Sequence, residues 1–463
     1  MTPACTLSLT QQVHGQLKRH LFPGDGKEVA AVLICTRVPG TRLRLLVRDV
    51  IAVPHEKCSR RDAVSLTWPS DYIERAIDLA EPGQLSLILL HSHPGGFAEF
   101  SPVDDRSDQE IMPAIFQACG SLHGSAVMLP NGVIFARIYT PSMKMMDVDL
   151  VSIVGPDLTF WWNDTRSQPI TRPMAFTSQM TAELGRLTAC VIGVSGTGSI
   201  VAEQLCRLGF GRVILIDHDK VETKNLNRIL NTIKTDADDT LAKVAVFASR
   251  ANQYREQEYV VPVVANVLTR KAVVAAGQAD VLFCCVDTLR ARSIADLLCK
   301  AFLLPLFDVG VAIPTRATTG EDRAIDEVTG RIDYVHPAAS SLFDRGIYTA
   351  ASLAAEALAE ADLQAHADQV RRGYIDEIPE QAPSVIALNM RAASACVMEF
   401  IARGFPFRHD ANTRYARTRF MLAEGVEEHE AEDAYPVSAS PHLARGDEQP
   451  LLGLPVLSDG EIE

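Results

Sequence analysis

Five apolar runs of strand length, separated by segments long enough for helices, occupy much of the second half of this 463-residue chain. Helix-like patterns begin near residue 198 and cover 242–255. Strands that alternate with helices build a mainly parallel sheet with helices on both of its faces. We therefore predict an α/β, Rossmann-like, doubly wound fold for this region, with its strands at residues 189–194, 212–216, 259–264, 281–285 and 305–309.

A glycine-rich turn, with Gly193, Gly196 and Gly198, leads from the first of these strands into the following helix. Backbone N–H groups and a helix N-terminus at such a turn would face a phosphate. The next strand ends at Asp217, whose carboxylate can accept hydrogen bonds from ribose hydroxyls. These features fit either NAD or a nucleoside triphosphate, and a glycine-rich connection can also be a plain tight turn.

The residues that follow Asp217 favour a nucleoside triphosphate over NAD. Attack at an α-phosphate releases pyrophosphate, and Arg228 and Lys243 would neutralise its charge, while Asp287 would hold Mg²⁺. NAD binding does not need these three residue types near the phosphate turn. Asn225 belongs to the same segment. Each of these residues could be structural by itself, so the prediction depends on their combination.

This combination resembles the ThiF/MoeB-like adenylyltransferases, a family that includes ubiquitin-activating enzymes. The resemblance runs from about residue 170 to 405 and implies ATP- and Mg²⁺-dependent adenylation of the C-terminal glycine of a ubiquitin-like protein. It also implies a homodimer, with Arg172 where the family has an arginine that can reach into the partner subunit's nucleotide site. Ser195 replaces a usual glycine. The family's motifs read here as Gly193–Gly198, Asp217–Asp219, Asn225–Arg228, Lys243 and Asp287.

In the first half of the chain, two histidines follow the apolar run at residues 85–90. Residues two apart on an extended chain face the same way, so His91 and His93 should converge. Asp104, at the start of the next helix, can lie close to both histidines. Two imidazoles and one carboxylate leave a fourth tetrahedral position for water, which is the arrangement of catalytic zinc.

Glu28 precedes an apolar run and is the candidate base for that water, while Ser101 could donate a hydrogen bond to a developing oxyanion. Together with the zinc ligands, these residues resemble the JAB/MPN (JAMM) metalloproteases, whose signature is an upstream Glu, H-[ST]-H-P and S-x-x-D. The resemblance covers about the first 150 residues and implies a peptidase or isopeptidase that acts at the C-terminus of ubiquitin-like proteins. The alternative is a loop with two solvated histidines. The signature is complete, at Glu28, His91–Pro94 and Ser101–Asp104.

A chain of 463 residues is longer than one core usually supports, so we expect two domains. The first should be an α+β unit that ends near an aromatic and Pro-containing stretch at 155–173. We expect the acidic run at 427–433 to be solvated. The predicted boundaries are 1–155 for the JAMM domain, 156–175 for a linker, 176–405 for the ThiF-like domain and 406–463 for an acidic C-terminal extension.

Composition excludes several classes of function. A formal net charge of -14 argues against a general nucleic-acid surface, because phosphate binding needs clustered Lys and Arg. No apolar run reaches the roughly 18 residues that a membrane span needs, and the N-terminus lacks a secretory signal. The ten cysteines contain no C-x-x-C pair and should be reduced and buried. We expect a cytoplasmic protein that binds neither nucleic acid nor membrane.

Many ubiquitin-activating enzymes carry a catalytic cysteine after the strand that corresponds here to residues 305–309. This chain has no cysteine from Ala301 to Ala395, and Cys396 lies in an Ala-rich segment that should be buried. We therefore expect the adenylate to pass directly to the cysteine of a conjugating enzyme, to a sulfur donor or to an amine.

These observations predict a bifunctional protein of a ubiquitin-like modification pathway, with a zinc peptidase and an activating domain on one chain. Such fusions resemble bacterial ubiquitin-like conjugation systems, some of which are linked to antiphage defence. Linkage would raise the local concentration of the ubiquitin-like protein at the second site. One alternative is the activation and release of a sulfur carrier in biosynthesis. Another is a binding scaffold with an inactive activating domain, which intact Arg228, Lys243 and Asp287 disfavour.

Overall fold

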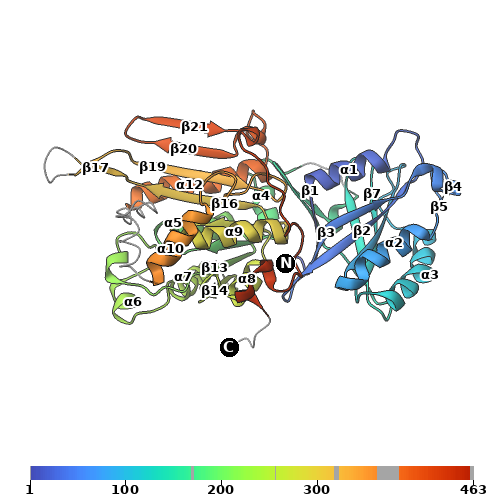
Figure 1. Ribbon diagram of the computed structural model, residues 1–463, viewed down its shortest axis with the longest axis horizontal. Helices are drawn as coiled ribbons and strands as arrows, with labels where there is room; N and C mark the ends of the chain where they lie inside the picture. Colours follow the sequence, from blue (N-terminus) through green and yellow to red (C-terminus); the bar gives the residue numbers. More distant parts are fainter. Residues whose placement is uncertain (1, 168–171, 256, 318–322, 362–384, 459–463) are drawn as a thin grey trace.

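The computed structural model describes residues 2–167, 172–255, 257–317, 323–361 and 385–458, and this part of the chain forms two large sheets, one in each half (Figure 1). The predicted fold class, an α+β N-terminal domain followed by a Rossmann-like, mainly parallel sheet, is confirmed. In the same described residues, no helix is both long enough and apolar enough to cross a membrane.

The first half contains one nine-stranded sheet with helices on both faces. Its strands run in the order β11-β10-β1-β3-β2-β6-β7-β8-β9. Its main elements are β1 (Cys5–Thr10), α1 (Gln11–Leu21), β2 (Ala30–Val38), β3 (Leu43–Ala52), α2 (Asp71–Ala80), β6 (Ser86–Ser92), α3 (Pro102–Ala118), β7 (His123–Met128), β8 (Ile134–Tyr139), β9 (Met145–Asp147), β10 (Leu150–Val154) and β11 (Leu158–Trp162). Strands β4 (Arg60–Arg61) and β5 (Leu66–Thr67) form a separate small hairpin.

Side chains alternate between the two faces of this sheet because the period of a strand is two residues. On β2, Leu33 and Cys35 pack in one core with Leu17 of α1. Val32 and Ile34 instead join the core that α2 and α3 cover. Both faces of β2 are therefore buried, which explains its continuous apolar sequence. Helices α2 and α3, together with the sheet, make this half the α+β unit that its sequence predicts.

The second half contains an eight-stranded sheet in the order β14-β13-β12-β15-β16-β19-β20-β21. The first five of these strands are parallel, and the last three are added antiparallel. Its strands are β12 (Thr188–Ile192), β13 (Arg212–Ile216), β14 (Val260–Val263), β15 (Val281–Cys284), β16 (Leu306–Ala312), β19 (Thr329–Val335), β20 (Arg417–Met421) and β21 (Val426–Glu430), and a hairpin of β17 (Thr315–Ala317) and β18 (Arg323–Ile325) follows β16. All five predicted strands are present.

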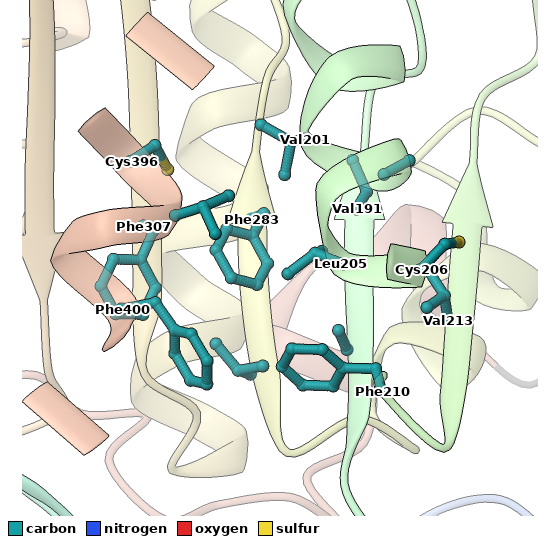
Figure 2. Close-up of a cluster of buried hydrophobic side chains, with 14 of the residues drawn as sticks. Val191, Val201, Leu205, Cys206, Phe210, Val213, Phe283, Phe307, Cys396 and Phe400 are labelled. Atoms are coloured by element: carbon teal, nitrogen blue, oxygen red, sulfur yellow. The ribbon is translucent and has the colours of Figure 1, made fainter. Parts of the chain in front are cut away.

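Helices cover both faces of the second sheet. On one face, α5 and α12 bury a cluster of aromatic rings that includes Phe283, Phe307 and Phe400 (Figure 2). On the other face, Leu298 of α9 and Ala276 of α8 pack against a second apolar core. The helices are α4 (Ser178–Leu184), α5 (Gly196–Leu208), α6 (Lys234–Asp238), α7 (Lys243–Ala251), α8 (Arg270–Ala276), α9 (Leu289–Phe302), α10 (Ala350–Ala361) and α12 (Ile386–Gly404).

Two segments between or after the expected domains also contribute strands. Residues 158–162, inside the expected linker, form β11, the edge strand of the first sheet. In the expected C-terminal extension, β20 and β21 lengthen the second sheet. Glu427 and Glu428 of the acidic run remain exposed on β21.

Buried polar contacts join the two halves. Arg42, after β2, pairs with Asp280 at 2.7 Å, and Arg44 donates to the carbonyl oxygen of Gly277 at 2.7 Å. The hydroxyl of Tyr334 donates to the carbonyl oxygen of Gly155 at 2.6 Å. Removing one partner of a buried ion pair lowers the free energy of unfolding by about 3–5 kcal/mol. These contacts hold the two domains in one arrangement.

All ten cysteines are free thiols. Cys58 and Cys285 are half-buried, and the other eight are buried. The prediction of buried cysteines is confirmed at these eight positions.

Candidate active sites

Three side chains, from β6, the loop that follows it and α3, meet in the first domain. The Nε2 atoms of His91 and His93 are 3.0 Å apart. The carboxylate of Asp104 lies 3.2 Å from Nε2 of His91 and 3.7 Å from Nε2 of His93. The three residues form one of the two groups in the described chain whose possible metal-ligating atoms lie within 4.8 Å of one another. The structure therefore brings the three predicted zinc ligands together.

Local sequence explains how Asp104 reaches this point. Ser101 is the N-cap of α3, and its hydroxyl accepts from the N–H of Asp104 at 3.2 Å, while the Asp104 carboxylate accepts from the N–H of Ser101 at 2.6 Å. This capping box fixes the orientation of the carboxylate. Burial raises the pKa of Asp104, but hydrogen bonds from His91 and His93 outweigh burial and hold the pKa below its usual range. Asp104 is therefore a carboxylate near neutral pH.

The ring of His93 is oriented by the loop that follows it. Its Nδ1 lies 2.8 Å from the carbonyl oxygen of Phe97, and a carbonyl can only accept a hydrogen bond. The proton must then be on Nδ1, which leaves the lone pair of Nε2 for a metal. Two zinc ligands at bond lengths of 2.0–2.1 Å and a tetrahedral angle would be about 3.3 Å apart. The donor set and its spacing thus fit zinc.

Glu28 precedes β2 and is 8 % exposed. Its N–H donates to the carbonyl oxygen of Asp62 at 2.8 Å, and its own carbonyl accepts from Nε of Arg61 at 2.9 Å. Burial raises the pKa of Glu28, and the nearby His91 and His93 partly oppose this effect. A carboxyl with a raised pKa is better matched to proton transfer near neutral pH than an ordinary one.

The second domain has a cavity of about 650 Å³ at the carboxyl ends of β12, β13 and β15. Parallel sheets bind ligands at this edge, where the strand order reverses. Gly198 packs against the turn rather than lining the cavity. Of the residues predicted for the nucleotide, the cavity is lined by Gly193, Gly196, Asp217, Asn225, Arg228, Lys243 and Asp287.

The glycine-rich turn needs glycine at two positions. Gly193 has φ +84°, and a Cβ there would lie 2.9 Å from Val286. A Cβ on Gly198 would overlap the carbonyl oxygen of Gly193. The turn therefore holds β12 and α5 close together.

Charged residues of the cavity are held by neighbouring groups. The Asp217 carboxylate accepts from the N–H groups of Val194 at 2.7 Å and Asp219 at 2.8 Å. Burial raises the pKa of Asp217, and the charge of Lys243 partly offsets this. Lys243 Nζ lies 2.7 Å from the Asp219 carboxylate. Arg228 is half-buried, and its guanidinium donates to the carbonyl oxygen of Lys224 at 3.0 Å.

Several lining residues were not predicted as site residues. Asn266 and Leu268 follow the carboxyl end of β14, and the rule that ligands lie at this edge of a parallel sheet could have found them. Asn389 reaches the cavity from α12, far away in sequence. Arg292 also lines the cavity, but its guanidinium pairs with the buried Asp308.

Arg172 lies away from the cavity on its own chain. It donates to the carbonyl oxygens of Leu158 at 2.6 Å and Arg403 at 2.7 Å, in a groove of about 340 Å³ between the domains. Cys396 is fully buried in α12, and burial raises the pKa of its thiol. A buried thiol with a raised pKa is a poor nucleophile.

Comparisons with known proteins agree with this division of the chain. A model of the ThiF family matches residues 171–391, and a model of prokaryotic homologs of the JAB domain matches residues 10–142. Ubiquitin-like modifier-activating enzyme 5 of Drosophila persimilis is 27% identical over 165 residues, or 34% of this chain and 40% of that protein. The enzyme of the same name from Caenorhabditis elegans is 28% identical over 164 residues, or 34% of this chain and 36% of that protein. The chain thus spans about two fifths of the length of these relatives.

Solved structures of E. coli MccB are similar to part of this chain. The crystal structure with ATP has a TM-score of 0.43 at 13% identity and covers 57% of this chain and 68% of MccB. The structure of this microcin C7 biosynthetic enzyme in complex with N-formylated MccA has a TM-score of 0.43 at 15% identity and the same coverage.

Proposed function

This chain joins a domain of the prokaryotic JAB family to a domain of the ThiF family, and from this premise we propose that it acts twice on a ubiquitin-like protein. The ThiF domain adenylates the C-terminal glycine, and the JAB domain cleaves peptide or isopeptide bonds at the same C-terminus. The observation that carries the proposal is the convergence of seven predicted nucleotide-site residues on one cavity. The names of the relatives, ubiquitin-like modifier-activating enzymes, support the substrate class.

In adenylation, the C-terminal carboxylate attacks the α-phosphate of ATP and pyrophosphate leaves. The backbone of Gly193 and Gly196 contacts the phosphates, and Asp217 accepts hydrogen bonds from the ribose. Arg228 and Lys243 neutralise the leaving phosphates. Asp287 would hold Mg²⁺, which when bound offsets phosphate charge.

For peptide cleavage, His91, His93 and Asp104 would hold zinc, which when bound lowers the pKa of a water molecule to about 7. Glu28 accepts a proton from the attacking water and returns it to the leaving amine. The hydroxyl of Ser101 accepts a hydrogen bond from Asp104, so its own proton is free to be donated to the developing oxyanion.

After adenylation, we propose direct transfer of the acyl group without a thioester on this chain. No cysteine lies from Ala301 to Ala395, and Cys396 is buried. An acyl adenylate is already activated, so the thiol of a conjugating enzyme, a sulfur donor or an amine can attack it. We further propose a prokaryotic, cytoplasmic setting, with antiphage defence as one context, and a homodimer in which Arg172 serves the partner subunit's nucleotide site.

ATP–pyrophosphate exchange tests the adenylation. The full chain is incubated with ATP, Mg²⁺, labelled pyrophosphate and ubiquitin-like proteins from the source genome that end in glycine. We expect label in ATP with the wild type and with Asp238→Ala, an exposed carboxylate outside the cavity, and none with Asp287→Ala. Folded wild-type protein that exchanges with none of these carriers would support the inactive-scaffold alternative instead.

A further inference from the structure

We propose that Arg61 is a positioning residue for Glu28, acting through the backbone of the loop that carries this candidate base. The proposal rests on the peptidase function proposed above. It concerns the small hairpin of β4 and β5, which contains Arg61 and is separate from the main sheet.

Glu28 lies outside regular structure, in the connection between α1 and β2. Its position therefore depends on contacts to neighbouring segments rather than on a strand ladder. Both of its backbone polar groups bind the hairpin: the N–H donates to Asp62 O at 2.8 Å, and the carbonyl accepts from Arg61 Nε at 2.9 Å. The hairpin thus holds the peptide groups on both sides of the Glu28 Cα.

The guanidinium of Arg61 also binds a second point on the same loop. Its Nη1 and Nη2 atoms lie 2.5 Å and 3.0 Å from the two carboxylate oxygens of Asp25. The Arg61 side chain is only 12% exposed. One planar group therefore joins residues three positions apart and leaves the loop little freedom, because a guanidinium presents its donors in a rigid fork.

On the other side of Glu28, the chain is hydrogen-bonded to Ser92, the last residue of β6, which also carries His91. The N–H of Val29 donates to Oγ of Ser92 at 3.0 Å, and the N–H of Ser92 donates to the carbonyl oxygen of Val29 at 3.0 Å. Ser92 lies between His91 and His93. The base is therefore fixed relative to the histidines from one side by Ser92 and from the other side by Arg61.

Arg60 is the matched control within the same hairpin. Its guanidinium pairs with the Asp62 carboxylate at 3.2 Å, and its side chain is 66% exposed. Replacing Arg60 removes the same charge at the neighbouring position and leaves the contacts of Arg61 with Glu28 and Asp25 in place. A difference between the two variants then reports on those contacts.

The kinetic test uses the zinc-loaded full chain and a ubiquitin-like protein from the source genome whose C-terminal glycine is linked to 7-amino-4-methylcoumarin. For Arg61→Ala we expect kcat to fall on the order of 10- to 100-fold, because a misplaced catalytic group can cost about 100-fold, while KM changes less than about twofold. Arg61→Lys should be intermediate, since one ammonium cannot bind Glu28 and Asp25 together in a fork. Arg60→Ala should match the wild type.

The structural test does not depend on activity. Crystal structures of the wild type, Arg61→Ala and Arg60→Ala should show the Glu28 carboxyl displaced from His91 and His93 in Arg61→Ala alone. An Arg61→Ala protein with wild-type kcat, or with Glu28 unmoved, would overturn the proposal. A wild type that cleaves no faster than Glu28→Gln would overturn the peptidase function instead, and the crystal structures would still decide the role of Arg61.

Discussion

The candidate metal site of His91, His93 and Asp104 shows how single residues set the chemistry. His93 is held in one tautomer by the Phe97 carbonyl, and Asp104 is held by the helix cap that it shares with Ser101. A backbone group thus orients each of these two side chains. Glu28 lies near both histidines without being part of the ligand group.

Removing a ligand should therefore differ from removing the base. Metal analysis of His91→Ala and Asp104→Ala should show loss of the single zinc of each chain, because two remaining ligands hold zinc poorly. Glu28→Gln should keep one zinc per chain and slow cleavage about 10²- to 10⁴-fold, since it loses only proton transfer. Stoichiometric zinc in the ligand variants would place the metal elsewhere.

At the scale of elements, β–α junctions carry most of both sites. Asp104 comes from the start of α3, and Gly193, Asp217 and Asp287 lie at or near the carboxyl ends of strands. These positions follow from local pattern, because strand ends and helix caps are visible in the sequence. Contacts such as Asn389 with the cavity depend on packing between distant segments, so local pattern could not predict them.

The β12–α5 junction gives a prediction about close packing. Gly198→Ala should lower stability by about 1–3 kcal/mol and abolish ATP binding, because the added methyl group must push the turn away from Gly193. Gly404→Ala is the control, since a Cβ there would have nothing within 4 Å. Calorimetric ATP titration and thermal unfolding measure both effects. Full ATP affinity in Gly198→Ala would show that the turn is looser than described.

The α4 helix gives a prediction about pH. Burial raises the pKa of Glu183 to about 7, although Arg172 and Arg186 oppose it. The folded state therefore binds the Glu183 proton more tightly than the unfolded state does. The resulting contribution to the free energy of unfolding is fully present below the unfolded carboxyl pKa of about 4.3 and is lost as pH rises through about 7.

Glu183→Gln should therefore unfold at a higher temperature than the wild type at pH 8 and at the same temperature at pH 4. Glu110→Gln, an exposed site on α3, should match the wild type at both pH values. Thermal unfolding followed by circular dichroism would detect the difference. A Glu183→Gln protein that unfolds at the wild-type temperature at pH 8 would mean that the Glu183 carboxylate is well solvated.

For the whole molecule, the five parallel strands and the type of sheet could be predicted, whereas the contacts that join the two domains could not. Apolar runs between helix patterns indicate a parallel sheet directly. The pair of Arg42 with Asp280 joins residues 238 positions apart, and nothing local to either residue indicates the other. The same is true of β20, whose partner β19 lies far earlier in the chain. Such pairings depend on the assembled surface.

We propose two independent active sites on one chain for one ubiquitin-like protein. The most direct test measures ATP–pyrophosphate exchange and coumarin-amide cleavage on the same preparations of wild type, Glu28→Gln and Asp287→Ala. We predict that Glu28→Gln loses cleavage and keeps exchange, and that Asp287→Ala loses exchange and keeps cleavage, because the two residues belong to different domains. Loss of both activities in either variant, or a wild type that lacks either activity, would rule out two independent active sites.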